Sequence, residues 1–257
     1  MVLIELLDEA LSMRYSRLPE IESETFSVIG DIHADSRALK ILTEDAFRPV
    51  VFLGDYADRG DEPVEVYRAI LEGYISGDYI LLRGNHESEN VIPHDLPCRL
   101  GEEEWGEEFY RKLLKFWKTL PCCCIINGEI FAVHGGIYTK GCRIVGEGIK
   151  RSELMRDDAE IELMWNDPWE NNECARNFER GIGYRFGAKA TGRFLEDLGL
   201  KVVVRSHEPY KVLKVEHNGM VVTIGSTGVY GTRIARLNVC GKFRDGYDLC
   251  QNFGEIF

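Results

Sequence analysis

Several features that would place this 257-residue sequence in a common protein class are missing. No two of its eight cysteines are spaced as C-x-x-C, which excludes a zinc ribbon. No apolar run approaches the roughly 20 residues that span a bilayer, so we expect no membrane segment. Lys and Arg number 31 against 43 Asp and Glu, and the net charge of −12 argues against a nucleic-acid partner. Repeats and low-complexity linkers are also absent, so we expect a single domain over residues 1–257.

The cysteines include a run of three, Cys122, Cys123 and Cys124. Adjacent strand residues face opposite sides of a sheet, so this run cannot form one compact ligand set and is expected in a core strand. We interpret all eight cysteines as reduced, small apolar residues, which favours a cytoplasmic protein.

The two ends of the chain have simple interpretations. The start, MVLIELLDEALSMRY, carries early acids and no basic region before an apolar core. It therefore predicts an N-terminal amphipathic helix within residues 1–24 and not a signal peptide. Residues 241–257 are expected to form a C-terminal tail with little room for an autoinhibitory segment, and we expect a monomer.

Short apolar runs that end in polar clusters recur along the chain. They span residues 26–29, 50–53, 79–82, 130–133, 202–204 and 220–224. Continuous β-branched runs of this length are typical of strands buried on both faces. Helical patterns lie over residues 36–47, 63–74, 102–120 and 186–198. Strand–helix alternation predicts parallel pairing in the first half, whereas short turns between 202 and 239 predict antiparallel pairing. The predicted fold class is α/β, with two mixed β-sheets packed as a central sandwich flanked by helices.

Local signals mark the ends of three of these helices. Asp35 is expected to cap the first, Pro63 to begin the second, and Gly199 to end the last. In the third, the apolar face is expected to join the core, and it comprises Trp105, Phe109, Leu113 and Trp117. The acidic run 102–104 would complement the dipole at the start of that helix.

Five strand ends carry Asp, Asn or His directly after the apolar run. In open α/β sheets the functional site lies at the carboxyl ends of the strands, so these side chains should meet. The candidate metal ligands are Asp31, His33, Asp55, Asn85, His134 and His207. Mixed imidazole, carboxylate and amide donors suit Mn, Fe or Zn and argue against Ca. Six donors exceed what one ion needs, so we expect two divalent metals about 3.5–4 Å apart that share the Asp55 carboxylate and support phosphate hydrolysis.

The segments GDIHAD, GDYADRG, RGNHE, HGG and RSHE resemble, in order and spacing, the signature of the PPP-type phosphoprotein phosphatases. These enzymes belong to the calcineurin-like metallophosphoesterase superfamily, and the resemblance covers roughly residues 25–240. It implies a short, single-domain serine/threonine phosphatase of prokaryotic type that acts on phosphorylated proteins. In such enzymes a hydroxide that bridges two metals attacks the phosphate in line.

Carried over to this chain, the resemblance implies a role for each matching residue. The metal ligands would be Asp31 and His33 on the first ion, Asp55 between both, and Asn85, His134 and His207 on the second. His86 would be the general acid that protonates the leaving oxygen, and Asp58 would orient it. The contacts to the substrate phosphate would come from Arg59, Arg180, Asn85 and Tyr230.

The chain also departs from the family pattern. Ala34 stands where the family has Gly, and the tyrosine loop appears here as STGVYG. Residues 88–104 replace the family's usual segment after RGNHE. His94 and His217 have no motif context and are expected to be surface or turn histidines. Asp167, in the segment WNDP, is either a helix cap or a support for Arg180.

Two other functions stay open. A dinucleoside tetraphosphatase or a broad phosphoesterase of the same superfamily would share the metal ligands. Those enzymes typically have GNHD, where this chain has Glu87, and many diesterases have a His-x-His motif, where this chain has Pro209. A non-catalytic scaffold would be expected to have lost a ligand, the acid or an arginine, and all of these are present.

Overall fold

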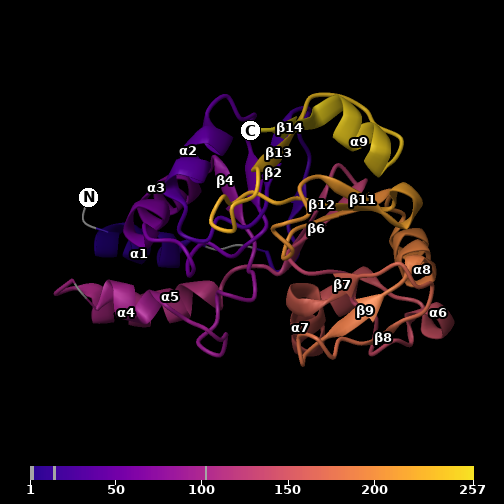
Figure 1. Cartoon of the computed structure of the whole chain (residues 1–257), viewed down its shortest axis with the longest axis horizontal. Helices are drawn as coiled ribbons and strands as arrows, with labels where there is room; N and C mark the ends of the chain where they lie inside the picture. Colours follow the sequence, from indigo (N-terminus) through magenta and orange to yellow (C-terminus); the bar gives the residue numbers. More distant parts are fainter. Residues whose placement is uncertain (1–2, 14–15, 102) are drawn as a thin grey trace.

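Two β-sheets stack at the centre of the molecule and helices cover their outer faces (Figure 1). The computed structural model describes residues 3–13, 16–101 and 103–257. One sheet has six strands in the order β1-β5-β6-β10-β12-β11, and the other has five in the order β14-β13-β2-β3-β4. A small third sheet, β7-β9-β8, lies with α6 and α7 at the lower right of Figure 1. The predicted α/β sandwich is confirmed.

The strands are short. Those of the six-stranded sheet are β1 (Glu20–Ile21), β5 (Cys123–Ile126), β6 (Ile130–Val133), β10 (Val202–Arg205), β12 (Val221–Thr223) and β11 (Lys214–Glu216). Those of the five-stranded sheet are β14 (Gly254–Ile256), β13 (Ala235–Val239), β2 (Phe26–Ile29), β3 (Val50–Phe52) and β4 (Tyr79–Leu81). The small sheet consists of β7 (Asp167–Pro168), β9 (Tyr184–Phe186) and β8 (Ala175–Arg176).

Helices cover the two outer faces, except the last helix of the chain, whose Leu249 packs into the layer between the sheets. The five-stranded sheet is covered by α1 (Leu3–Ser12), α2 (Ser36–Thr43), α3 (Pro63–Ile75), α4 (Leu96–Leu100) and α5 (Gly106–Trp117). Later in the chain come α6 (Ile144–Glu147), α7 (Asp157–Trp165), α8 (Ala188–Leu198) and α9 (Gly246–Phe253), with 3₁₀ turns at Arg151–Met155 and His217–Gly219.

Alternate residues of the central strands face two different hydrophobic layers. Val51 and Leu53 pack between the sheets together with Val204 of β10. Val50 and Phe52 point the opposite way, into the layer beneath α1 to α5. Every residue of β2, β3, β5, β6, β10 and β12 is buried, which confirms the interpretation of most of the continuous apolar runs. In β4, Ile80 is partly exposed.

Strand pairing agrees with the prediction in the first half and differs later. β2, β3 and β4 are parallel, and β13 is antiparallel to β2, both as expected. β10, however, is parallel to β6 and to β12, so the prediction of antiparallel pairing from residue 202 onward is wrong there. For β12 the cause is β11, a partly exposed strand that the apolar pattern missed and that reverses the chain once more. β6 and β10 are parallel because the long connection between them, which ends in the helix at Ala188–Leu198, crosses over before it re-enters the sheet.

The residues predicted to cap or end helices do so, but two of the predicted helices are shorter than expected. The Asp35 side chain accepts a hydrogen bond from the Ala38 amide at 2.8 Å, and Gly199 ends α8 with φ of 69°. The predicted helix over 36–47 stops at Thr43. The predicted helix over 102–120 is shortened to α5, and a separate short helix, α4, precedes it in the chain. The predicted apolar face lies on or beside α5.

The ends of the chain are more structured than the sequence indicated. Within residues 1–24, α1 ends at Ser12, and β1 follows at Glu20. Residues 1–2 and 14–15 of that predicted helical region, and residue 102 of the predicted third helix, lie outside the described residues. The 241–257 segment contains α9 and β14, and β14 pairs with β13 at the edge of the five-stranded sheet.

The expectation that all cysteines are reduced is wrong for two of them. Cys142 and Cys174 form a disulfide, which joins the loop after β6 to the loop before β8. The other six are free thiols, and Cys122, Cys123 and Cys124 are buried in or beside β5 as expected. Among the described residues, no helix is both long and apolar enough to cross a membrane.

Candidate metal centre and active site

The six predicted metal ligands come from strands of both central sheets. Asp31 and His33 follow β2, Asp55 follows β3, Asn85 follows β4, His134 follows β6 and His207 follows β10. None of these side chains exposes more than 6% of its surface. The structure therefore brings all six together, although they lie as far as 176 positions apart in the sequence.

His134 and Asp55 occupy the middle of this cluster. His134 Nε2 lies 2.8 Å from Asn85 Oδ1, 3.0 Å from His207 Nδ1 and 3.5 Å from Asp55 Oδ2. Asp55 Oδ2 also lies 3.7 Å from His33 Nε2. On the far side, Asp31 Oδ1 is 3.6 Å from His134 Nδ1. Asp31 Oδ2 lies 3.9 Å from His33 Nε2, so both carboxylates lie within 4 Å of His33 and His134. Only Asp55 contacts both imidazoles through a single oxygen, Oδ2.

The backbone around these ligands turns sharply. Asp55 and His207 have φ of 55° and 67°, in the left-handed region that non-glycine residues seldom adopt. Such conformations persist where the surrounding structure enforces them, and they are frequent at functional sites. Gly84 lets two chain segments meet here, because a Cβ on it would lie 2.2 Å from Asp55 Oδ1.

The donor set fits divalent cations. Among the described residues, Asp31 Oδ2 and His207 Nε2 are buried without any hydrogen-bond partner. Burial, with the charge of Asp31 nearby, raises the pKa of Asp55 well above its usual range, as expected for carboxylates that lack a compensating cation. Burial lowers the pKa of His33 to about 3 and that of His134 well below its usual value. The imidazoles are therefore unprotonated, which is the form that binds metals.

Next to the cluster, His86 and Asp58 form a buried pair. His86 Nδ1 lies 2.7 Å from Asp58 Oδ2, and the His86 amide donates to Asp55 Oδ1 at 2.9 Å. Burial raises the pKa of Asp58, but hydrogen bonds from His86 and His94 outweigh it and hold that pKa well below its usual range. Asp58 is thus an anion that accepts a hydrogen bond from the Nδ1–H group of His86. His86 itself lines the cleft.

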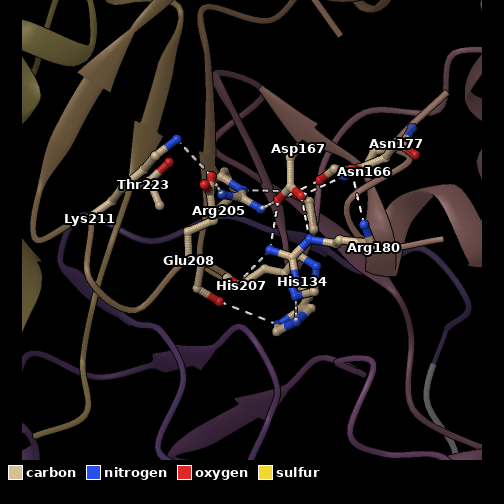
Figure 2. Close-up of polar contacts among 12 residues, drawn as sticks. His134, Asn166, Asp167, Asn177, Arg180, Arg205, His207, Glu208, Lys211 and Thr223 are labelled. Carbon is tan, nitrogen blue, oxygen red and sulfur yellow. Dashed lines mark hydrogen bonds and ion pairs between the residues drawn. The ribbon is translucent and has the colours of Figure 1, made fainter. Parts of the chain in front are cut away.

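Arg180 is held by a network of polar contacts around Asp167 (Figure 2). Arg180 Nη2 lies 3.2 Å from Asp167 Oδ1 and donates to the His207 carbonyl at 3.2 Å. Arg205, which is fully buried, donates to the same Asp167 oxygen at 2.9 Å and to Glu208 at 2.7 Å. Of the two alternatives left open for Asp167, the structure shows support for Arg180.

A cleft of about 590 Å³ opens onto these groups. Of the sequence-predicted residues, it is lined by His33, Asp55, Arg59, Asn85, His86, Arg180, His207 and Tyr230. Asp31, Asp58 and His134 lie behind this surface. The cleft therefore joins metal donors, an imidazole and two guanidinium groups, a combination suited to an anionic ester.

A model of the calcineurin-like phosphoesterase family matches residues 25–211, which contain every one of these groups except Tyr230. The chain belongs to the calcineurin-like phosphoesterase family.

Relatives of this calcineurin-like phosphoesterase include serine/threonine-protein phosphatase 5 of Arabidopsis thaliana, at 30% identity over 79% of this chain and 40% of that protein. Serine/threonine-protein phosphatase 5 of Homo sapiens is 29% identical over 81% of this chain and 44% of that protein. The chain thus spans less than half the length of these curated relatives. A solved serine/threonine phosphatase of Saccharomyces cerevisiae superimposes with a TM-score of 0.82 over 99% of this chain and 87% of that chain. Its sequence identity of 23% establishes a shared fold.

Tyr230 lies at the rim of the phosphoesterase cleft. Its side chain is 47% exposed, and its ring centroid is 5.7 Å from that of His33. Arg59 donates from Nη1 to the Pro93 carbonyl at 2.7 Å, and its Nη2 lies 3.5 Å from His86 Nε2. Both predicted phosphate contacts therefore face the cleft, and their roles stay predictions.

Sequence reasoning missed two residues that the phosphoesterase site uses. Glu87 is buried and accepts hydrogen bonds from the amides of Asp55 and Gly84, both at 2.8 Å, so it fixes the loops that carry two ligands. Burial raises the pKa of Glu87 to about 7. His94, expected at the surface or in a turn, instead contacts Asp58. Its only sequence signal was its position in the 88–104 segment, where the chain departs from the family pattern.

Proposed function

We propose that this chain is a metal-dependent phosphomonoester hydrolase that removes phosphate from phosphoserine and phosphothreonine in proteins. The observation that carries the proposal is the cleft in which the His86–Asp58 pair, Arg59 and Arg180 surround the six-donor cluster. The names of the curated relatives support protein serine/threonine phosphatase activity as the specific reaction.

Two divalent metals would be held by Asp31, His33, Asp55, Asn85, His134 and His207, with Asp55 shared between them. Two groups of buried side chains have ligand atoms within 4.8 Å of one another, namely His33, Asp55 and His86, and Asp55, His134 and His207. Asp55 belongs to both, which supports its bridging role. When bound, the metals would supply a hydroxide at neutral pH and neutralise charge on the phosphate. Manganese, iron and zinc all suit this donor set.

The chain's own residues would bind the phosphate and supply the proton to the leaving group. Arg59 and Arg180 would bind the phosphate oxygens, and Asp167 keeps Arg180 aimed at the cleft. Overall, a P–O bond to a water-derived oxygen forms while the bond to the seryl or threonyl oxygen breaks. That leaving oxygen takes a proton from His86 Nε2, and Asp58 stabilises the protonated imidazole through Nδ1.

The test is an assay of metal-stripped protein after addition of Mn, Fe, Zn or Mg. Phosphoserine, phosphothreonine and phosphotyrosine peptides would be compared with diadenosine tetraphosphate at equal concentrations. We expect the protein to release phosphate from the first two peptides in a metal-dependent way. A matched Asp55→Asn variant should release none. Faster turnover of the dinucleotide would instead establish the alternative, a dinucleoside tetraphosphatase.

We also propose that the protein is a cytoplasmic monomer, that its substrates are phosphorylated proteins and that it binds no nucleic acid. Six free cysteines support the cytoplasmic location, and the Cys142–Cys174 disulfide is the feature that argues against it. The net charge of −12 disfavours nucleic acid as a partner.

A further inference from the structure

The carboxylate of Asp58 has four hydrogen-bond donors around it. Oδ2 accepts from Nδ1 of His86 at 2.7 Å and lies 2.9 Å from Nδ1 of His94. Oδ1 accepts from the amides of Asp95 and Leu96, both at 2.8 Å. Three of the four donors therefore come from the segment 94–96, so this segment and His86 share one acceptor group.

The ring of His94 is fixed at both ends. Its Nε2 lies 2.8 Å from the hydroxyl of Tyr110 on α5, and only 11% of its side chain is exposed. The ring centroid of Trp117 lies 6.3 Å away and closes the other side. Because Asp58 is an anion, His94 Nδ1 must carry its proton toward Oδ2, as His86 Nδ1 does. The two imidazoles thus donate to the same oxygen.

The same segment also holds the neighbouring arginine. The Asp95 carboxylate accepts from the Arg59 amide at 3.0 Å, and the Pro93 carbonyl accepts from Arg59 Nη1 at 2.7 Å. We call residues 93–96 the clamp segment. Its backbone and the Asp95 side chain hold Arg59, whereas the side chain of His94 contacts only Asp58 and Tyr110 among the polar groups described.

We propose that His94 is a positioning residue for the leaving-group proton donor, acting through Asp58 on His86. This inference rests on the proposed function. A carboxylate oxygen held by two ring donors stays in one orientation, and that orientation sets the direction of the His86 ring. Removing His94 takes away one of the two ring donors on Oδ2 and opens space beside it, so the carboxylate is held less tightly by the two amides on Oδ1 and by His86 alone. The imidazole ring of His86 is then no longer held in one orientation, while the contacts of Arg59 stay intact.

The expected signature depends on the leaving group. A seryl or threonyl oxygen is a poor leaving group and needs a proton, whereas 4-nitrophenolate needs little help. We expect His94→Ala to lower kcat on phosphoserine and phosphothreonine peptides roughly 10- to 100-fold, in line with other residues that orient a functional imidazole. On 4-nitrophenyl phosphate kcat should change less than about threefold, and KM should stay unchanged on both.

Matched variants separate positioning from general damage. His94→Asn keeps an N–H near the Nδ1 position and should recover most of the peptide activity, and Tyr110→Phe should give a smaller loss of the same kind. His217→Ala removes the other histidine outside the motifs and should leave both activities unchanged. In a His86→Asn background, His94→Ala should add no further loss, because both act on one step. Thermal unfolding and metal content are measured for every variant.

A second readout does not depend on turnover. In the zinc-loaded protein, the Nδ1 protons of His86 and His94 should give two downfield NMR signals, assigned by their loss in His86→Asn and His94→Ala. We expect His94→Ala to shift the His86 signal. An unmoved His86 signal would overturn the proposal, as would equal losses on both substrates or full additivity with His86→Asn. If wild-type protein releases no phosphate from the peptides, the proposed function fails, and the NMR result still decides the role of His94.

Discussion

Arg180 owes its orientation to a carboxylate that it shares with a fully buried arginine. Asp167 lies between Arg180 and Arg205, and Asn177 Nδ2 donates to it at 2.9 Å (Figure 2). Arg205 has a second anionic partner in Glu208. The guanidinium of Arg180, the proposed phosphate contact, is thus one end of a largely buried ion-pair network. The middle of that network can be changed by substitution without altering Arg180 itself.

Asp167→Asn should therefore raise KM for phosphopeptides by roughly tenfold or more, since it removes the charge that orients Arg180. Glu208→Gln is the matched control, because it also weakens the network around Arg205 but accepts no hydrogen bond from Arg180. Both variants should lose about 1–3 kcal/mol of unfolding free energy. Steady-state kinetics and denaturant unfolding measure the two effects. Equal KM values for the two variants would contradict a specific role of Asp167.

At the scale of elements, β5 shows why three consecutive cysteines have no common function. Cys123 packs on the helix side of its sheet with Phe131, whereas Cys124 packs between the sheets with Val204. Burial raises the pKa of Cys122 to about 12, and the charge of Glu160 adds to the shift. Thiols in such a strand are protonated and unreactive at neutral pH.

Alkylation should therefore separate the free cysteines into two classes. At pH 8 we expect iodoacetamide to modify the exposed Cys98 and Cys240 in native protein and to leave Cys122 unmodified until denaturant is added. Because the pKa of Cys122 is raised, the fraction of reactive thiolate stays small below that value. Peptide mass mapping after timed alkylation measures the rates. Native modification of Cys122 as fast as that of Cys240 would show that this thiol beside β5 is not buried as described.

At the scale of the whole molecule, the cleft depends on contacts between distant parts of the chain. The disulfide between Cys142 and Cys174 spans 32 residues and ties the loop after β6 to the small sheet that carries Asp167. The metal donors come from both central sheets, so the ions would join the two layers of the sandwich. The disulfide and the bound metals should each contribute measurably to the free energy of unfolding.

Reduction of the disulfide should lower the free energy of unfolding by about 3–4 kcal/mol, the loop-closure contribution for a loop of this length. A Cys142→Ser/Cys174→Ser variant should unfold like the reduced protein and should not respond to reductant. Guanidinium unfolding with and without reductant measures the difference. If mass mapping of protein isolated from cells finds both thiols free, the link does not form there, and the cytoplasmic location gains support.

Metal removal should destabilise the protein, because Asp31 and Asp55 then remain buried without a counter-charge. Adding Mn or Zn back should raise the unfolding temperature, with a gain of about 2.7 kcal/mol at a free-metal concentration 100 times Kd. Calorimetry of stripped and reloaded protein measures it. The Asp55→Asn variant should respond much more weakly. An unfolding temperature that changes neither with chelator nor with added metal would contradict the proposed metal site.

By itself, the amino-acid sequence determined the sandwich fold, the strand ends and the six donors that follow them. These depend on local rules, since an apolar run that stops at a polar residue marks a buried strand and its edge. Residues without such a pattern could not be placed from the sequence. The partly exposed β11 changed the direction of β12, and the terminal β14 joined a sheet edge. Only tertiary structure decided that Cys142 meets Cys174 and that His94 meets Asp58, because these contacts depend on where separate loops lie in space.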